Sequence, residues 1–126
     1  IASKALMPAT RVIGAEPAGA DDAMRSFQSG QRQPQTAPET VADGLRTALG
    51  QLNFTIIREQ VDDILTANDD VIITAMRLVW TRMKLVIEPS AAVGLAVVMS
   101  HPERFRGKRV AVILTGGNVD LDKLPW

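Results

Sequence analysis

The stretch RVIGAEPAGADDAMRSFQSG, residues 11–30, decides the fold class because it reads as a strand, a turn and a helix in direct succession. Residues 11–16 form a short apolar run that suits a buried strand. Asp21 and Asp22 precede a helical segment that stops at Gly30. Acidic residues are favoured at the start of a helix and glycine just after its end. A strand that leads through a turn into a helix is the repeating unit of an α/β sheet.

The rest of the chain continues this alternation. Residues 31–40 are polar and contain two prolines, which predicts a loop. The other expected elements are a helix that stops at Pro8, strands at residues 54–59, 61–67 and 109–117, an extended segment at residues 85–89, and helices at residues 69–84 and 90–105. This order predicts an α/β fold, in which a mainly parallel sheet is flanked by helices in a single unit over residues 1–126.

The helix at residues 69–84 has the clearest pattern, because its apolar side chains recur at helical spacing. Asn68 or Asp69 can cap its start. We expect four of its large side chains in the core, namely Met76, Val79, Trp80 and Met83. In the next helix, Ser90 is the candidate cap and Pro102 the expected stop.

Composition excludes several classes of function. The chain has 126 residues, with 14 basic and 14 acidic side chains, so no net charge favours nucleic acid or an anionic membrane. No apolar run approaches the roughly 18 residues of a membrane span. Without cysteine there are no disulfides and no thiolate sites, which fits a cytoplasmic protein. His101 is the only histidine, so we expect no metal or triad role for it.

Ligands of open α/β sheets bind beyond the carboxyl ends of the strands, so the residues that follow each strand are candidates for a site. Glu16 and Asp22, with a backbone carbonyl between them, are hard oxygen ligands that suit Mg²⁺ or Ca²⁺. The alternative is a solvated turn with an acidic helix start. Spacing alone leaves both interpretations open.

Two later segments end in the same suggestive way. Glu88 stands between an extended segment and a helix start, where a carboxylate can hold a ligand or orient a base. At Thr115-Gly116-Gly117-Asn118, the glycines permit close approach of the backbone, and the hydroxyl can donate a hydrogen bond to a neutral ring nitrogen. The alternatives are a capped helix with a surface glutamate and a simple tight turn.

Five segments in series carry a resemblance to a known family. They are AEPAGADD (15–22), TVADGLR (40–46), VDDILTANDD (61–70), LVWTRMKLVIEPSAAVG (78–94) and VAVILTGGNVDL (110–121). Together they resemble the C-terminal half of serine racemase and the related serine/threonine dehydratases. These are pyridoxal-phosphate enzymes of the tryptophan-synthase-β fold type, in which this half belongs to the large, cofactor-binding domain.

The resemblance implies a set of residues around the cofactor. The Thr115 hydroxyl faces the pyridine nitrogen, with Gly116 beside it. Gly44 forms part of the cofactor wall, and Glu88 is the acid near the ring. Serine racemase has serine at the position of Thr115. The hydrogen bond can survive this change, but the extra methyl group narrows the choice of rotamers.

The resemblance also implies two sites for other ligands. Glu16, the Ala20 carbonyl and Asp22 hold a divalent cation, Mg²⁺ or Ca²⁺, with waters completing its shell. Lys84 and Asn118 match positions that contact ATP as an activator in the serine racemase branch.

A hydroxyl at the ring nitrogen leaves the ring largely neutral, whereas a carboxylate favours the protonated ring. Loss of a β-leaving group then competes well with reprotonation. The implied reaction is elimination of water from a 3-hydroxy amino acid, giving a keto acid and ammonia. Racemisation of serine is the rival outcome, and 3-hydroxyaspartate is a third substrate option.

The sequence contains none of the catalytic residues that this chemistry needs. Its lysines are Lys4, Lys84, Lys108 and Lys123, and none lies in the context of a Schiff-base lysine. A glycine-rich phosphate loop is not found either. We therefore expect a fragment that is inactive alone, that needs the N-terminal half of the same enzyme and that forms a homodimer when complete.

Two alternatives come from other classes of protein. One is a non-catalytic α/β module that binds a divalent metal or a nucleotide. The other is an assembly unit that works only by docking to an N-terminal partner chain. Saturable Mg²⁺ binding without affinity for pyridoxal phosphate favours the first of these.

Overall fold

The computed structural model describes all residues from Ile1 to Trp126 and has two strands and several helices. The helices are α1 (Ala2–Leu6), α2 (Asp22–Ser29), α3 (Gln51–Gln60), α4 (Asp69–Leu78), α5 (Pro89–Ser100) and α6 (Pro102–Phe105). A 3-10 turn, η1, spans Asp43–Leu45, and a π-helical turn, η2, continues α4 over Val79–Met83. The strands are β1 (Ile13–Pro17) and β2 (Asp63–Ala67). No helix is long and apolar enough to cross a membrane.

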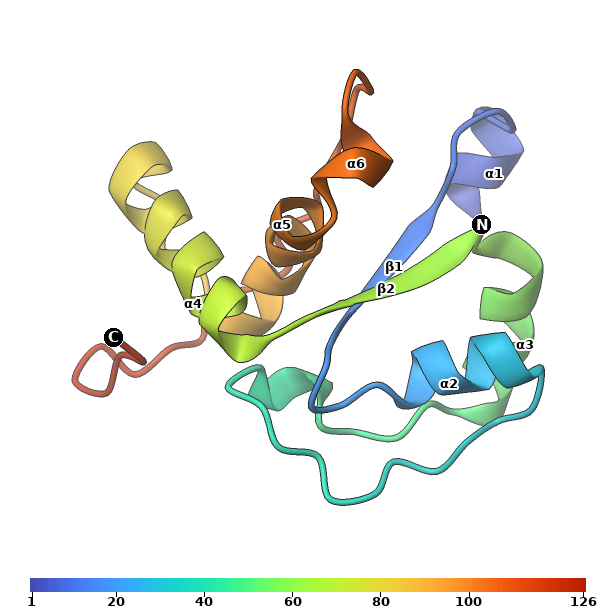
Figure 1. The fold of residues 1–126 in the computed structure, drawn as a ribbon, viewed down its shortest axis with the longest axis horizontal. Coiled ribbons are helices and arrows are strands. Elements are labelled where there is room, and N and C mark those ends of the chain that lie inside the picture. Colours follow the sequence, from blue (N-terminus) through green and yellow to red (C-terminus); the bar gives the residue numbers. More distant parts are fainter.

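The two strands form a parallel sheet in which both strands end at the same level. Ile13 pairs with Asp63 and Pro17 pairs with Ala67. Helices α4 and α5 lie together on one side of the strands, while α2 and α3 lie on the other (Figure 1). Helices on both faces of a parallel pair confirm the predicted α/β class.

The core lies between α4 and α5. From α4 and η2 it takes Ile72, Ala75, Met76 and Val79, and from α5 it takes Ala91, Ala92, Val93, Ala96 and Val97. The alanines of α5 let the two helices approach closely, and every member of this set is at most 2% exposed. Met76 and Val79 are core residues as predicted. Met83 is not, because it is 57% exposed at the end of η2.

The strand expected at residues 54–59 is wrong, because these residues belong to α3. Their β-branched and aromatic side chains favour a strand by propensity. Phe54 and Ile57 nevertheless lie three positions apart and share one helical face, with Phe54 buried and Ile57 half-buried. Burial of this face decides the conformation, and α3 packs beside α2.

The strand expected at residues 109–117 is also wrong, because this segment has no ladder partner. It nevertheless alternates like a strand in its exposure. Val112 and Leu114 are partly buried, whereas Ile113 between them is 81% exposed. A strand is defined by hydrogen bonds to a neighbour. Here a single main-chain bond, from Glu88 N to Gly116 O at 3.1 Å, ties the segment to a distant part of the chain.

The ends of α5 also differ from the prediction. Glu88 is its N-cap residue and Pro89 its first helical residue, so Ser90 lies inside the helix. Proline is favoured at the first position because that position needs no N–H donor. For the same reason Pro102 begins α6, and α5 already ends at Ser100.

Replacing Ile72, which is fully buried, by alanine should lower the free energy of unfolding of the chain by about 2–5 kcal/mol, because it leaves a cavity in the α4–α5 core. Ile113→Ala is the matched control, since this side chain is 81% exposed, and it should change stability by less than about 0.5 kcal/mol. Chemical denaturation of residues 1–126 measures both. Equal losses in the two variants would contradict the assignment of the core.

Candidate functional site

The candidate residues form two groups near the carboxyl ends of the strands. The first is the acidic turn, residues 16–22, which joins β1 to α2. The second, here called the Glu88 wall, consists of Gly44, Glu88, Ser90 and Gly116. One loop, residues 39–50, connects the two groups because it contacts both.

Glu16 points from β1 toward the first turn of α2, where main-chain N–H groups are free to donate. Its carboxylate accepts hydrogen bonds from Met24 N at 2.7 Å and from Ala23 N at 3.3 Å. Burial nevertheless raises the pKa of Glu16 to about 7; the two hydrogen bonds oppose this rise, and the nearby charges of Asp22 and Asp21 add to it. The acidic turn is thus a place where negative charge is costly.

Asp22 is only 2% exposed and anchors the loop on both of its carboxylate oxygens. Oδ1 accepts a hydrogen bond from Gln35 Nε2 at 2.9 Å, and Oδ2 accepts one from Leu49 N at 2.8 Å. Gly19 adds a further tie, because its carbonyl accepts a hydrogen bond from Glu39 N at 2.9 Å. A side chain at Gly19 would overlap the Glu39 carbonyl, so the turn requires glycine there.

The donor set of the acidic turn fits a hard cation. Ala20 is 1% exposed, and its carbonyl oxygen accepts no hydrogen bond within the chain. A buried carbonyl without a donor is a rare and costly group that a cation can satisfy. No cluster of three or more histidine, cysteine, aspartate or glutamate side chains is present, so a cation here would depend on two carboxylates, this carbonyl and water.

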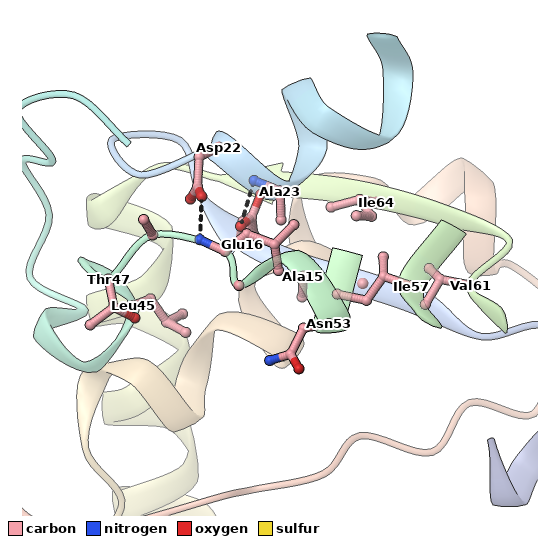
Figure 2. A pocket seen from close by; sticks show the side chains of 14 residues that line it. Ala15, Glu16, Asp22, Ala23, Leu45, Thr47, Asn53, Ile57, Val61 and Ile64 are labelled. Carbon is pink, nitrogen blue, oxygen red and sulfur yellow. Dashed lines mark hydrogen bonds between the residues drawn. The ribbon is translucent and has the colours of Figure 1, made fainter. Parts of the chain in front are cut away.

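A cavity of about 310 Å³ opens beside the acidic turn. Figure 2 shows Glu16 and Asp22 at one end of it and Ile57, Val61 and Ile64 at the other. Its walls come from both strands, from α3 and from residues 45–50. None of the four predicted cofactor-binding residues lines it. The cavity therefore belongs to the acidic turn and is separate from the Glu88 wall.

The structure brings three of the predicted cofactor residues together in the Glu88 wall. Gly44 N donates a hydrogen bond to Ser90 Oγ at 3.1 Å. A side chain at Gly116 would overlap the Glu88 carboxylate, so glycine is what lets these two segments meet. The Glu88 carboxylate is half-buried and has no hydrogen bond or ion pair within the chain. It is therefore free to contact a ligand.

Thr115 lies next to Gly116 at the end of the extended segment. It is exposed, and its hydroxyl makes no hydrogen bond within the chain. A free hydroxyl beside a free carboxylate and a close-packed glycine is a donor set that fits a planar heteroaromatic ligand, since each group can take a ring substituent or ring nitrogen.

The predicted nucleotide contacts lie on neighbouring segments without touching each other. Lys84 adopts a left-handed conformation (φ 58°) after η2, and its ammonium donates to Thr81 O at 2.8 Å. Asn118 is exposed and follows Gly117, which packs against the Val86 carbonyl. Both side chains are accessible, and no hydrogen bond joins them.

Sequence reasoning missed the residues that hold the loop in place. The local pattern marks Asp69 only as a helix cap, yet its carboxylate binds Thr40 and Val41 across the fold. Thr40 and Asp69 are 29 positions apart, so no short motif links them. His101 has a packing role, with Nε2 lying 3.0 Å from Thr66 O of β2.

Comparison with known proteins supplies the family context. The model of the pyridoxal-phosphate dependent enzyme family matches residues 1–116. The chain is 54% identical over 121 residues to a beta-hydroxyaspartate dehydratase of Paracoccus denitrificans, covering 96% of this chain and 38% of that protein. It is 46% identical over 129 residues to the serine racemase of Bos taurus, covering 98% of this chain and 38% of that one.

A solved structure shares the arrangement of elements. The serine racemase of Dictyostelium discoideum superposes with a TM-score of 0.87 at 45% identity, covering 94% of this chain and 38% of that one. A bacterial-type match of the same kind is a threonine deaminase, with a TM-score of 0.90 at 46% identity over 95% of this chain and 44% of that one. The chain thus spans about two-fifths of the length of the relatives it matches.

The raised pKa of Glu16 predicts a pH dependence of stability. The folded chain keeps the Glu16 proton up to about pH 7, whereas the unfolded chain loses it near the ordinary value of 4.5. Between these values the folded state binds more protons, so the free energy of unfolding should fall as pH rises from 4.5 through 7.

Glu16→Gln should flatten this fall, because glutamine cannot ionise. Denaturant titrations of the metal-free chain at about pH 5, 6, 7 and 8 provide the measurement. Asp21→Asn serves as the control, since no shift ties Asp21 to this pH range, and it should keep the slope. A wild-type stability that rises over this interval would refute the placement of Glu16.

Proposed function

This chain belongs to the family of pyridoxal-phosphate dependent enzymes, and we propose that it forms part of an ammonia-lyase that acts on a 3-hydroxy amino acid. The reaction is elimination of water, which yields a keto acid and ammonia. The observation that carries this proposal is the Glu88 wall, where Gly44, Glu88 and Gly116 meet beside the free hydroxyl of Thr115. The chain is the C-terminal part of the large cofactor-binding domain.

Pyridoxal phosphate, when bound, supplies the electron sink that stabilises negative charge at the substrate α-carbon. The residues of this chain set how strong that sink is. Thr115 donates a hydrogen bond to the ring nitrogen without protonating it, because a hydroxyl gives up no proton at neutral pH. A largely neutral ring favours loss of the β-hydroxyl over reprotonation of the α-carbon.

Glu88 and the two glycines complete the contact surface. The half-buried carboxylate of Glu88 orients groups near the ring, and Gly116 allows the backbone to come within contact distance. Gly44 presents a flat, side-chain-free surface from the opposite element, where Ser90 fixes it. These groups bind and orient the ring and exclude water from one side of it.

Divalent cation binding is the second part of the proposal. We assign Glu16, the Ala20 carbonyl and Asp22 as ligands for Mg²⁺ or Ca²⁺, supported by the undonated carbonyl and by the charge-disfavouring surroundings of Glu16. The cation would offset the repulsion among these carboxylates and secure the turn that Asp22 ties to residues 35 and 49. Its role is structural support for the loop.

The substrate is proposed at the level of its class. Relatives include a hydroxyaspartate dehydratase and serine racemases, so 3-hydroxyaspartate, serine and threonine are the candidates. Elimination is the proposed main reaction and racemisation the rival. ATP contact at Lys84 and Asn118 belongs to the racemase-like version of the proposal, and both side chains are accessible for it.

The remaining partners are also proposals. Ile113, Val86 and Leu85 are 81%, 57% and 46% exposed, and they form an apolar surface beside the Glu88 wall. Exposed apolar side chains of this kind mark contact sites, which supports docking of the other half of the same enzyme and assembly as a homodimer.

Thr115→Asp in the full-length protein should slow elimination by on the order of ten-fold or more, because a carboxylate favours the protonated ring and so favours reprotonation. Keto-acid release from serine, threonine and 3-hydroxyaspartate, recorded together with D-serine, measures this shift. Thr115→Ser keeps the hydroxyl and should stay close to wild type. Unchanged elimination in the aspartate variant with cofactor still bound would rule out this role of the hydroxyl.

Asp22→Asn should weaken Mg²⁺ and Ca²⁺ binding by about ten-fold or more, since it removes a ligand charge from the site. Calorimetric titration of the metal-free protein measures the affinity. Asp21→Asn is the control, because Asp21 pairs with Arg25 at 2.7 Å instead of facing the turn. Cation binding without any affinity for pyridoxal phosphate would instead favour the non-catalytic module.

A further inference from the structure

The loop that carries Gly44 passes over the start of α4, and Asp69 holds it there. Asp69 Oδ1 accepts a hydrogen bond from Thr40 Oγ at 2.6 Å, and Oδ2 accepts one from Val41 N at 2.8 Å. Thr40 is 3% exposed, so these bonds are made away from solvent. Bonds to a carboxylate are the stronger class of hydrogen bond, and here both of its oxygens are used on consecutive residues of the loop.

Thr40 transmits this anchor along the backbone. Its hydroxyl accepts a hydrogen bond from Ala42 N at 3.1 Å, and its carbonyl accepts bonds from the Arg46 guanidinium, with Nε at 3.0 Å. Ala42 is fully buried in the core cluster. The turn η1 between these residues is therefore fixed at both ends, by Thr40 and Ala42 before it and by Arg46 after it.

The fixed turn determines where Gly44 lies. Gly44 N donates to Ser90 Oγ at 3.1 Å, and Ser90 lies just beyond Glu88 at the start of α5. The sequence of contacts runs from Asp69 through Thr40 and Ala42 to Gly44 and then to Ser90. Asp69 makes no hydrogen bond with the residues of the Glu88 wall itself.

We propose that Asp69 is a positioning residue for cofactor binding, because its carboxylate fixes Thr40 and thereby sets Gly44 against the Glu88 wall. This inference rests on the proposed function, in which Gly44 contacts pyridoxal phosphate. A cofactor contact made by a backbone atom depends on the placement of the whole turn, since no rotamer can compensate for a shift.

Asp70 separates this role from a general effect on the helix. Both aspartates lie in the first turn of α4, where negative charge favours the helix dipole. Asp70 Oδ1 accepts a hydrogen bond only from Val71 N of the same turn, at 2.8 Å, and its side chain is exposed. Only Asp69 reaches the loop, so the pair forms a matched comparison within one helix.

The test uses the full-length protein and a set of variants: Asp69→Ala, Thr40→Val, Thr40→Ser and Asp70→Ala. Hydrogen exchange of the cofactor-free protein should be about ten-fold faster or more at the amides of Val41 and Ala42 in Asp69→Ala and Thr40→Val, because each loses a charge-assisted bond. Thr40→Ser keeps the hydroxyl and should restore protection. Asp70→Ala should leave these amides unchanged.

Affinity for pyridoxal phosphate is the second readout, measured by absorbance and fluorescence titration of the cofactor-free protein. Asp69→Ala and Thr40→Val should weaken it by about ten-fold, whereas Thr40→Ser and Asp70→Ala should match wild type. Thr40→Val is nearly isosteric, so it tests the proposal even if Asp69→Ala does not fold.

Two outcomes would overturn the inference alone. One is faster exchange in Asp69→Ala and Thr40→Val with wild-type cofactor affinity, and the other is unchanged exchange in both variants. A wild-type protein with no affinity for pyridoxal phosphate would overturn the proposed function, and the inference with it. Weakened affinity in the two loop variants, with rescue by Thr40→Ser, supports the positioning role.

Discussion

The packing of α5 between α4 and the β1–β2 sheet is the contact on which the rest of the structure depends. Five small or branched side chains of α5, from Ala91 to Val97, are buried in it. Because both strands end at the same level, this packing also fixes the start of α5 near the carboxyl ends of the strands. The positions of Glu88 and Ser90 therefore depend on an apolar contact that neither of them makes.

A second, polar layer holds the loop of residues 39–50 over this framework. Two carboxylates, Asp22 and Asp69, use both of their oxygens on hydrogen bonds to residues 35, 40, 41 and 49. A buried or partly buried carboxylate is costly unless it is fully hydrogen-bonded, and these two are. Removing either one would leave loop donors without partners, so the loop has little freedom to rearrange while the helices stay folded.

The sequence was sufficient where the signal is local. The strands at β1 and β2, the start and glycine stop of α2 and the periodicity of α4 all follow from adjacent residues. It failed where partners lie far apart. The 54–59 segment has strand-like residues, but burial of Phe54 against the fold makes it helical. The bond from Thr40 to Asp69 spans 29 positions and has no local trace, so the residues that fix Gly44 could not be predicted.

The two candidate sites differ in what they still require. In the acidic turn the carboxylates are already hydrogen-bonded, and only the Ala20 carbonyl is left without a donor. In the Glu88 wall the opposite holds, since the backbone is close-packed while the Glu88 carboxylate and the Thr115 hydroxyl have no partner. Polar groups that a fold positions but leaves unpaired are where a ligand gains most, because binding supplies bonds that the protein lacks. This asymmetry makes the turn a support and the wall the place where a ligand is recognised.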